Sequence, residues 1–539
     1  MVYVSDAPVE VPARPHTSVA AVVRQHASVL SLTIAIVVAL ACRTTALATY
    51  GLSEDEVAKL QAIESYRDGR FSANAEHPML MKLAMWASLN LADSWNAHVP
   101  PSLTMTTETA LRLPNALAGT ATVAAVYGVS TLLFGPVVAA IAAFILALDP
   151  TVIALNRIGK EDTFLMLFLM LGVLAYETAK RIGADDPMRA RRWYDLSGIS
   201  FGLMLASKYM PHFFGMYALF NVIAQRQPGA NRPRVLTYNC LIGLTFLAAN
   251  FAILLPSTWA YCLAYVRGDG LLHTGYVYDG RTYVNATTAI FAGVPVTYYL
   301  DLLMTKLPIP VLAGAALALP LLVSRRRERG FVWLRVFLIF TLLPYSLLGA
   351  KFQRYALPMF VVTIMLAAVG LVGLVTWLWR RPWPRPMRLG VAGVVAVLAF
   401  VPIVMAPVRA APYYSVQQNL IGAAHAAPGV TFPEEAYDFG IREAVQAVAA
   451  VARPHASVVS DASRVTSYYL ARSSRPDLKM RSLSTQGFAA SGEQWVFVQP
   501  GHIYFENAAL VTQLRQSTRP WRQYHLAGTP VLEVFRLER

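Results

Sequence analysis

The stretch SVLSLTIAIVVALACRTTALATY, residues 28–50, decides the class to which this protein belongs. An apolar helix of about 20 residues is long enough to cross the roughly 30 Å hydrocarbon core of a bilayer. The stretch is too long for the core of a signal peptide, and no clear small-x-small cleavage site ends it. It therefore predicts a retained membrane anchor near the N-terminus.

Ten further apolar stretches continue this pattern along the first three quarters of the chain. Pro211, next to Lys208, separates two short stretches, which are interpreted as half-length helices because proline interrupts a helix. The sequence thus predicts an all-α polytopic membrane protein with about eleven transmembrane helices. The further stretches lie at 111–134, 136–155, 163–179, 196–211, 212–225, 236–256, 300–323, 331–349, 355–379 and 389–408.

The composition agrees with a membrane protein. Of the 539 residues, 56% are hydrophobic and 14% are charged, whereas a soluble domain has about 25% charged residues. Disordered chains, coiled coils and secreted disulfide scaffolds are excluded. The three cysteines, Cys42, Cys240 and Cys262, show no CxxC spacing and no nearby histidine cluster, so a structural zinc site or a disulfide framework is not expected.

The basic residues predict the orientation in the membrane. The net charge is +15, and the arginines and lysines gather in four segments, at 180–192, 226–234, 325–329 and 380–388. With eleven spans and a cytoplasmic N-terminus, all four segments lie in the cytoplasm, as the positive-inside rule requires. The high pI is therefore a sign of topology, and nucleic acid is not an expected partner.

The same count predicts the domain organisation. Residues 1–27 form a cytoplasmic N-terminus, and residues 28–408 form a transmembrane domain with outer loops at 51–110 and 257–299. From residue 409 to 539 the composition becomes globular, and predicted strands alternate with predicted helices. This alternation indicates a small extracytoplasmic α/β domain.

Charged residues gather on the predicted outer surface. In the first outer loop Glu54, Asp55 and Glu56 follow the first span, and Glu76, His77 and Lys82 come later. An acidic triplet after a span can simply be a solvated helix start, in which Ser53 and Glu56 form a capping box. The second outer segment holds four charged residues next to hydrocarbon, where charges are costly and commonly functional; they are Arg157, Lys160, Glu161 and Asp162.

Two later polar segments face the same side. Lys208 lies at the end of a half-length helix, and Lys351, Arg354 and Tyr355 lie between two spans. Such residues can also snorkel to the water surface without binding a ligand. His273, in the third outer loop, is more often an ordinary loop residue than a functional one.

Carboxylates and cations together above the lipid suit a ligand with an anionic headgroup and a lipid tail. Arginine holds a phosphate through two parallel hydrogen bonds, and lysine holds it as a point charge. A carboxylate can remove the proton from an incoming hydroxyl group. Since a sugar on a lipid phosphate already has a good leaving group, one base and several cations would suffice for its transfer.

At these residues the sequence resembles the glycosyltransferase C-fold superfamily. Within it, the sequence is similar to the dolichyl-phosphate-mannose protein mannosyltransferases and their bacterial relatives, which include the lipid A aminoarabinose transferases. The resemblance extends over roughly residues 28–410. One departure is His-Pro-Met at 77–79, where the family has two prolines after the histidine. The matching motifs are Asp55-Glu56, the segment Gly69 to Lys82 with Glu76-His77-Pro78, Arg157 with Asp162, the segment 202–209, and Lys351 to Pro358.

The resemblance implies a role for each motif. Asp55, with Glu56 beside it, would be the catalytic base, and Asp162 would help to position the site. The donor phosphate would be bound by a set of basic residues and one tyrosine: Lys82, Arg157, Lys208, Lys351, Arg354 and Tyr355. Glu76, His77 and His273 are further site candidates. No cofactor is assigned, and a divalent metal bridging acid and phosphate is left open.

The expected activity is inverting transfer of a sugar from a polyprenyl-phosphate donor to a hydroxyl or amine acceptor outside the cell membrane. Acceptors left open are protein serine or threonine, lipid A, another glycolipid and a cell-wall polymer. One alternative is a non-catalytic subunit of a larger membrane complex. A transporter is a weaker alternative, since transporters place charges mid-span and carry inverted repeats.

Overall fold

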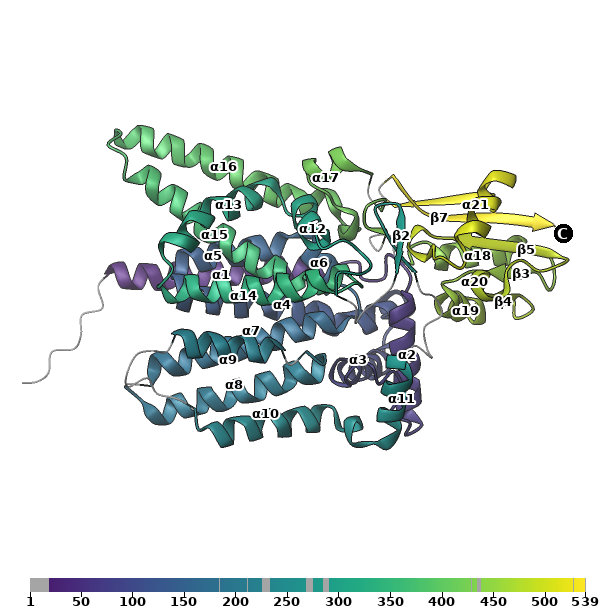
Figure 1. Ribbon diagram of the computed structural model, residues 1–539, viewed down its shortest axis with the longest axis horizontal. Coiled ribbons are helices and arrows are strands. Elements are labelled where there is room, and N and C mark those ends of the chain that lie inside the picture. The colour runs from purple at the N-terminus through teal and green to yellow at the C-terminus, as the bar shows by residue number, and fades with distance from the viewer. Residues whose placement is uncertain are drawn as a thin grey trace, which may run out of the picture.

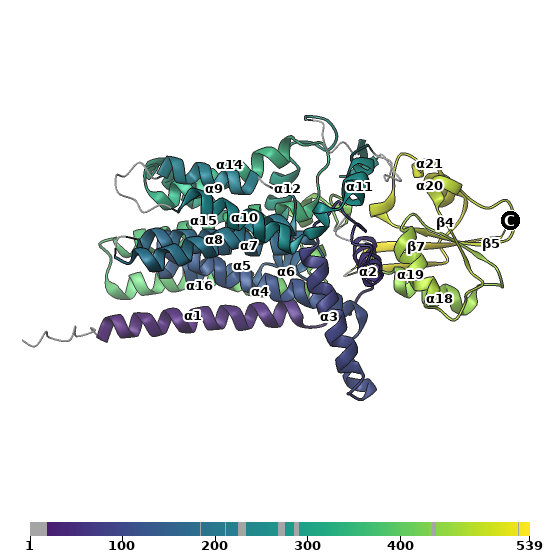
Figure 2. The same ribbon diagram turned by 90° about the horizontal axis from the view of Figure 1, so that it is seen from below.

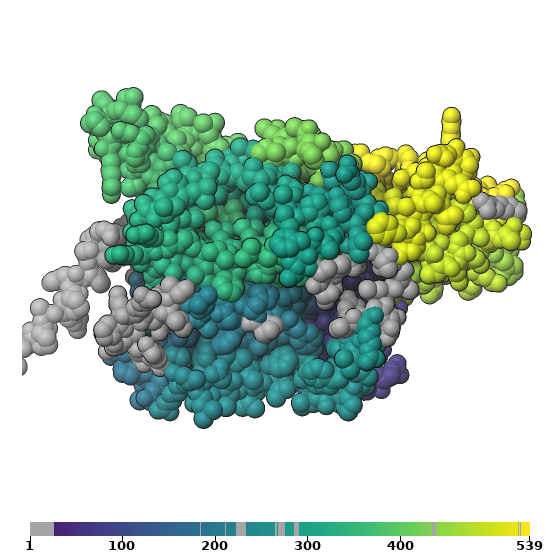
Figure 3. All heavy atoms as spheres, in the orientation of Figure 1, coloured from purple at the N-terminus to yellow at the C-terminus, as the bar shows by residue number. Residues whose placement is uncertain are grey.

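The computed structural model has a bundle of helices that run side by side along its long axis, and a sheet at one end (Figures 1 and 2). The space-filling view shows the C-terminal residues as a separate lobe against the end of the bundle (Figure 3). The start of α1 and the turn between α15 and α16 lie at the opposite end (Figure 1). The structure describes residues 19–183, 185–210, 212–224, 233–267, 275–284, 290–427, 429–433, 438–526 and 528–538.

The bundle is built from long, mostly apolar helices in antiparallel succession. Its members are α1 (Val19–Thr44), α4 (Thr107–Phe134), α5 (Pro136–Leu148), α7 (Glu161–Ile182), α8 (Pro187–Ser207), α9 (His212–Ala224), α10 (Val235–Ala249), α13 (Ile309–Ser324), α14 (Arg329–Leu347), α15 (Leu357–Trp379) and α16 (Arg385–Ala410).

By length and apolar composition, six helices among the described residues can cross a membrane, or seven if α5 and the bent continuation α6 (Pro150–Asn156) form one span. This confirms a multi-pass membrane protein. The predicted number of eleven is not reached by this criterion. The helices α9, α10 and α13 are shorter than a full span, and α8 carries a polar first half.

The centre of the bundle is α15, which is buried along most of its length. It packs against α13 through two glycines, since a side chain on Gly370 would meet the backbone of Gly314 on the neighbouring helix. Without a hydrophobic effect inside lipid, such small residues allow the close backbone contact that holds membrane helices together.

Short elements form an outer layer between the bundle and the C-terminal lobe. The helix α3 projects away from the bundle axis (Figure 2). The outer layer comprises α2 (Glu54–Arg67), α3 (Leu80–Asn96), α6, α11 (Pro256–Arg267), the hairpin β1 (Gly275–Tyr278) and β2 (Arg281–Val284), α12 (Tyr298–Lys306) and α17 (Leu420–His425).

The C-terminal lobe contains a five-stranded mixed sheet of order β4-β3-β5-β7-β6. β3 is parallel to β4 and β5, whereas β7 is antiparallel to β5 and β6. The strands are β3 (Ser457–Val459), β4 (Lys479–Arg481), β5 (Glu493–Val498), β6 (Arg522–Leu526) and β7 (Thr529–Glu538), and the longer helices are α18 (Ile441–Val451), α19 (Ser463–Ala471) and α21 (Ala508–Ser517).

The two faces of this sheet belong to different cores. Val459, Val496 and Phe535 pack with α21 on one face. Trp495 and Val534, on the other face, belong to the same apolar cluster as α18 and α19, and this cluster continues into α2 and α3 of the outer layer. The C-terminal lobe therefore shares a core with the outer layer of the membrane bundle.

The glycine contact between α13 and α15 can be tested by one methyl group. We expect Gly370→Ala to destabilise the protein by about 1–3 kcal/mol, because the new carbon forces two packed helices apart. Gly373→Ala on the same helix is the matched control, since its new carbon meets only Leu321 Cδ1, at 3.5 Å. Thermal unfolding in detergent measures both, and equal midpoints for the two variants would contradict the packing argument.

Candidate functional site

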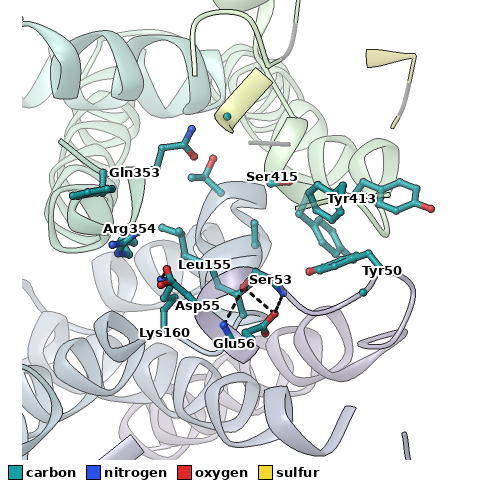
Figure 4. Close-up of a pocket in the computed structure, with 18 of the residues that line it drawn as sticks. Tyr50, Ser53, Asp55, Glu56, Leu155, Lys160, Gln353, Arg354, Tyr413 and Ser415 are labelled. Carbon is teal, nitrogen blue, oxygen red and sulfur yellow. Dashed lines mark hydrogen bonds and ion pairs between the residues drawn. The ribbon is translucent and has the colours of Figure 1, made fainter. Parts of the chain in front are cut away.

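A cavity of about 300 Å³ lies between the outer end of the bundle and the C-terminal lobe. Figure 4 shows Asp55, Lys160 and Arg354 grouped on one side and Tyr50 and Tyr413 on the other. The cavity thus has a charged end and an aromatic end. It is lined by Tyr50, Gly51, Ser53, Asp55, Glu56, Arg112, Thr151, Ala154, Leu155, Ile158, Lys160, Gly275, Tyr276, Phe352, Gln353, Arg354, Tyr413, Tyr414, Ser415, Phe439, Gly501 and Tyr504.

The first turn of α2 brings the acidic triplet to the cavity. Ser53 caps the helix, and the Glu56 carboxylate accepts a hydrogen bond from the Ser53 backbone N–H at 2.9 Å, so the expected capping box is present. Negative side chains in a first turn also interact favourably with the positive end of the helix dipole. Local sequence alone therefore accounts for where α2 begins.

Glu56 is held in a buried, bidentate pair with Arg112 of α4. Both oxygen contacts are 2.8 Å, neither side chain is exposed, and the Gly159 backbone N–H donates to Glu56 at 3.0 Å. Burial raises the pKa of Glu56, but the Arg112 guanidinium lowers it by more. The net pKa is therefore below its ordinary value, and the carboxylate stays ionised. Glu56 is saturated with donors, and its observed interactions are structural.

Asp55, one residue earlier, points to the cavity and forms an ion pair with Lys160. Its side chain is 30% exposed, against 5% for Lys160. Of the two carboxylates of the triplet that line the cavity, Asp55 is partly exposed and Glu56 is fully buried. This is the geometry that a general base needs, since it must come within hydrogen-bond reach of the acceptor.

Arg354 is the predicted phosphate ligand that lies in the cavity wall. Its guanidinium stacks 4.3 Å from the Phe352 ring and 5.5 Å from the ring of Tyr355. Stacking on aromatic faces orients the plane of a guanidinium, the side chain that can hold an anion through two parallel hydrogen bonds.

Three other predicted phosphate ligands, Lys82, Lys351 and Arg157, bind backbone carbonyls instead. Lys82 donates to the carbonyls of Asn74 (2.6 Å) and His77 (2.9 Å). Lys351 donates to those of Val294 (2.7 Å) and Leu348 (2.5 Å). Burial lowers the pKa of Lys82 to about 7 and that of Lys351 to about 8. Neither residue lines the cavity.

Arg157 closes the end of α1. It donates to the carbonyls of Cys42 (2.9 Å), Thr45 (2.6 Å) and Ala46 (2.9 Å). The last carbonyls of a helix have no partner within the helix, and an arginine is a common way to satisfy them. Arg157 is therefore a helix cap in this structure.

Asp162 and Lys208 pair with each other at 2.6 Å, and Lys208 lies 4.1 Å from the Tyr355 ring. This pair joins α7, α8 and the segment before α15 just beside the cavity. Glu161 similarly pairs with Lys59 at 2.8 Å, with the His77 ring 3.7 Å away. These residues form the support behind the cavity wall.

Glu76 and His77 are not among the residues that line the cavity. Glu76 accepts a hydrogen bond from Asn74 at 2.5 Å. Burial lowers the pKa of His77 well below its ordinary range, so its ring is neutral. His273 lies outside the described residues. Among the residues that the structure describes, no group of three or more histidine, cysteine or acidic side chains could hold a metal ion.

Sequence reasoning missed Arg112 and the wall contributed by the C-terminal lobe. Arg112 lies at the second residue of an apolar stretch, where it looked like the edge of a span. A buried charge so close to a span was the one available signal. Phe439, Gly501 and Tyr504 come from the tail, whose sequence carries no motif that points to the cavity.

Glu54 attaches the C-terminal lobe to α2. Its carboxylate accepts hydrogen bonds from the backbone N–H groups of Arg464 (2.8 Å) and Val465 (2.7 Å) at the start of α19. Its own N–H donates to Asp438 at 2.6 Å. Asp438 in turn contacts His502 Nε2 at 2.7 Å, and His502 Nδ1 lies 2.8 Å from the hydroxyl of Tyr504 in the cavity wall.

The comparisons with known proteins bear on the fold and on the family that the chain resembles. Residues 91–253 match the model of the dolichyl-phosphate-mannose-protein mannosyltransferase family. Among solved structures, ArnT from Cupriavidus metallidurans bound to undecaprenyl phosphate is 14% identical, with a TM-score of 0.53 over 95% of this chain and 98% of that chain. An Archaeoglobus fulgidus oligosaccharyltransferase tethered to an acceptor peptide is 12% identical, with a TM-score of 0.50 over 94% of this chain and 74% of that chain. The search of curated proteins found no match.

The chain has the GT-C glycosyltransferase fold. The predicted resemblance to the protein mannosyltransferases and aminoarabinose transferases is confirmed. In this GT-C protein, the charged end of the cavity is built by the first turn of α2 and by the segments before α7 and α15.

The network around Glu54 predicts a pH dependence of this GT-C protein. Burial and the nearby Asp438 raise the pKa of Glu54 from 4.5 to about 7. Burial lowers the pKa of His502, but Asp438 raises it more, so it lies above 6.5. Both groups hold protons more tightly in the folded state, so their contribution to stability is present at low pH and is lost as pH rises through the folded pKa values.

Glu54→Gln mimics the protonated acid at every pH. The midpoint of thermal unfolding of this variant minus that of the wild type should therefore rise by a few degrees from pH 5.5 to pH 8. Unfolding in detergent at both pH values measures this difference. Glu64→Gln removes a carboxylate from an exposed position of the same helix and should show a constant difference. A gain for Glu54→Gln that shrinks with rising pH would contradict the assignment.

Proposed function

We propose that this protein is an inverting glycosyltransferase that moves a sugar from a polyprenyl-phosphate donor to a hydroxyl or amine acceptor at the extracytoplasmic face of the membrane. The observation that carries the proposal is a single cavity in which an accessible carboxylate, Asp55, lies beside two cations, Lys160 and Arg354. The GT-C fold and the mannosyltransferase family match support the reaction class.

The chemistry assigns one task to each side chain. Asp55 accepts the proton of the acceptor while the acceptor oxygen or nitrogen attacks the anomeric carbon from the face opposite the phosphate. The bond from this carbon to the phosphate oxygen breaks, its electron pair stays on the phosphate, and the configuration inverts. Arg354 and Lys160 stabilise the additional negative charge of the leaving lipid phosphate.

The donor class has independent support from the structural comparison. The similar ArnT structure contains undecaprenyl phosphate. A polyprenyl tail would occupy the lipid beside the bundle, and its phosphate would then lie at the level where the charged end of the cavity begins. We assign the donor to the Lys160 and Arg354 side and the acceptor to the side that the C-terminal lobe closes.

We further propose eleven membrane crossings, with the short helices α8, α9, α10 and α13 crossing as members of the bundle. The N-terminus (1–27) lies in the cytoplasm, residues 28–408 form the membrane domain, and the α/β region 409–539 lies outside. The Arg-rich turn between α15 and α16 supports this orientation, because it lies at the end of the bundle opposite the C-terminal lobe (Figure 1).

The first test concerns Asp55. Asp55→Asn keeps the size of the side chain but removes the proton acceptor, so sugar transfer should fall by about 10²–10⁴-fold. The assay is transfer of labelled sugar from a polyprenyl-phosphate donor by the protein in nanodiscs.

Asp68→Asn is the matched control, since Asp68 lies on the exposed surface after α2 and pairs with Arg70 at 2.8 Å. It should transfer sugar at the wild-type rate. Full transfer by Asp55→Asn would mean that another group is the base. Full function of this variant in the cell would favour the alternative, a non-catalytic subunit of a membrane complex.

The second test concerns orientation. In a variant whose three native cysteines are replaced by serine, Lys479→Cys in the C-terminal lobe should react with a membrane-impermeant maleimide in intact cells. Arg327→Cys, in the turn between α13 and α14, should react only after lysis. Both positions are exposed, so access to the reagent decides the outcome. The reverse pattern would contradict the proposed topology.

A further inference from the structure

The ion pair between Lys160 and Asp55 conflicts with the role proposed for each residue. A general base needs a lone pair directed at the acceptor, yet Asp55 forms an ion pair with Lys160. Lys160 also lines the cavity in which a donor phosphate would lie. A phosphate oxygen and the Asp55 carboxylate would therefore compete for one cation.

The backbone holds this pair together. Asp55 precedes Glu56, and Glu56 accepts a hydrogen bond from the N–H of Gly159, which precedes Lys160 (3.0 Å). Asn115 donates to the Lys160 carbonyl at 2.7 Å. The two partners are thus anchored next to each other from both sides, so their contact is a built feature of the site.

Among the described residues, Arg112, Lys160 and Arg354 are the cations in the cavity wall. Arg112 is bound to Glu56 and to the carbonyls of Leu47, Tyr50 and Gly51, so a donor could not displace its partners cheaply. A phosphate in this cavity would thus meet Lys160 and Arg354, and the Asp55 side chain that pairs with Lys160 is 30% exposed.

We infer that Lys160 is a donor-phosphate ligand that Asp55 occupies when the site is empty, so that donor binding releases the base. This inference rests on the proposed function. The donor would bind first, its phosphodiester would take over the Lys160 ammonium, and Asp55 would then be able to accept the proton of the acceptor. Without a bound donor, Asp55 would stay in its ion pair with Lys160 and could not accept the proton.

The same competition would help product release. After transfer, the proton lies on Asp55 and the lipid phosphate carries one more negative charge, so Lys160 holds the product. Once Asp55 loses its proton to water, the carboxylate competes for Lys160 again. The interaction between Lys160 and the lipid phosphate product then weakens. Asp55 would therefore act twice, as the base and as the group that expels the lipid phosphate.

This competition has a signature in binding alone, for which undecaprenyl phosphate is the probe and full-length protein in nanodiscs is the sample. Asp55→Asn should bind the probe about tenfold more tightly than the wild type, because the Asp55 carboxylate no longer competes for Lys160. Lys160→Gln should bind it about tenfold more weakly. The double variant should bind the probe as weakly as Lys160→Gln alone, because without the Lys160 ammonium the Asp55 carboxylate has nothing for which to compete.

The double variant separates competition for Lys160 from general repulsion between charges. If Asp55→Asn tightens binding equally with and without Lys160, long-range repulsion explains the result and the inference is wrong. It is also wrong if Asp55→Asn leaves binding unchanged or weakens it. Asp68→Asn and Lys479→Gln, at exposed positions away from the cavity, should leave binding at the wild-type value.

The outcomes distinguish this inference from the proposed function. Binding of the probe by the wild type without tightening in Asp55→Asn would overturn the competition but leave the donor class intact. A wild type that binds no undecaprenyl phosphate would overturn the proposed donor and, with it, the role of Lys160. Opposite shifts in the two single variants, with no added effect in the double variant, would establish the inference.

Discussion

The buried pair between Glu56 and Arg112 is the interaction on which the site depends. It joins the start of α2 to α4, and Arg112 also binds three carbonyls in the loop after α1. Two buried charges are tolerated only when each is fully paired, and removal of one partner leaves the other strongly destabilised. Because Glu56 also accepts a hydrogen bond from Gly159, this one pair fixes the positions of both Asp55 and Lys160 at the cavity's charged end.

Three consecutive carboxylates have three separate tasks because they lie in the first turn of a helix. Successive side chains of a helix point about 100° apart, at 3.6 residues per turn. Glu54 therefore reaches the C-terminal lobe, Asp55 reaches the cavity and Glu56 reaches Arg112. The sequence shows only an acidic triplet, and the direction of each member depends on where α2 begins and on what surrounds it.

The apolar stretches predicted a helical, multi-pass membrane protein because hydrophobic length is a local property, whereas the predicted eleven spans stay a proposal. The predicted cations illustrate the limit of such reasoning. Lys82, Lys351 and Arg157 lie at the expected surface, yet they bind backbone carbonyls. Ends of helices and irregular loops leave carbonyls unsatisfied, and a cation that serves them looks the same in sequence as one that binds a phosphate. Only long-range packing separates Arg354 and Lys160 from the rest.

The C-terminal lobe completes the site and is more than an attached domain. Ile441 and Val445 of its α18 share one apolar cluster with Leu52 and Val57 near the start of α2. The same segment of the outer loop thus sets the direction of Asp55 and receives the lobe. Since the lobe contributes Phe439, Gly501 and Tyr504 to the cavity wall, changes in its loops can reshape that part of the wall without moving Asp55, Lys160 or Arg354. A fold that builds the two ends of one cavity from different parts of the chain can change one end and keep the chemistry of the other.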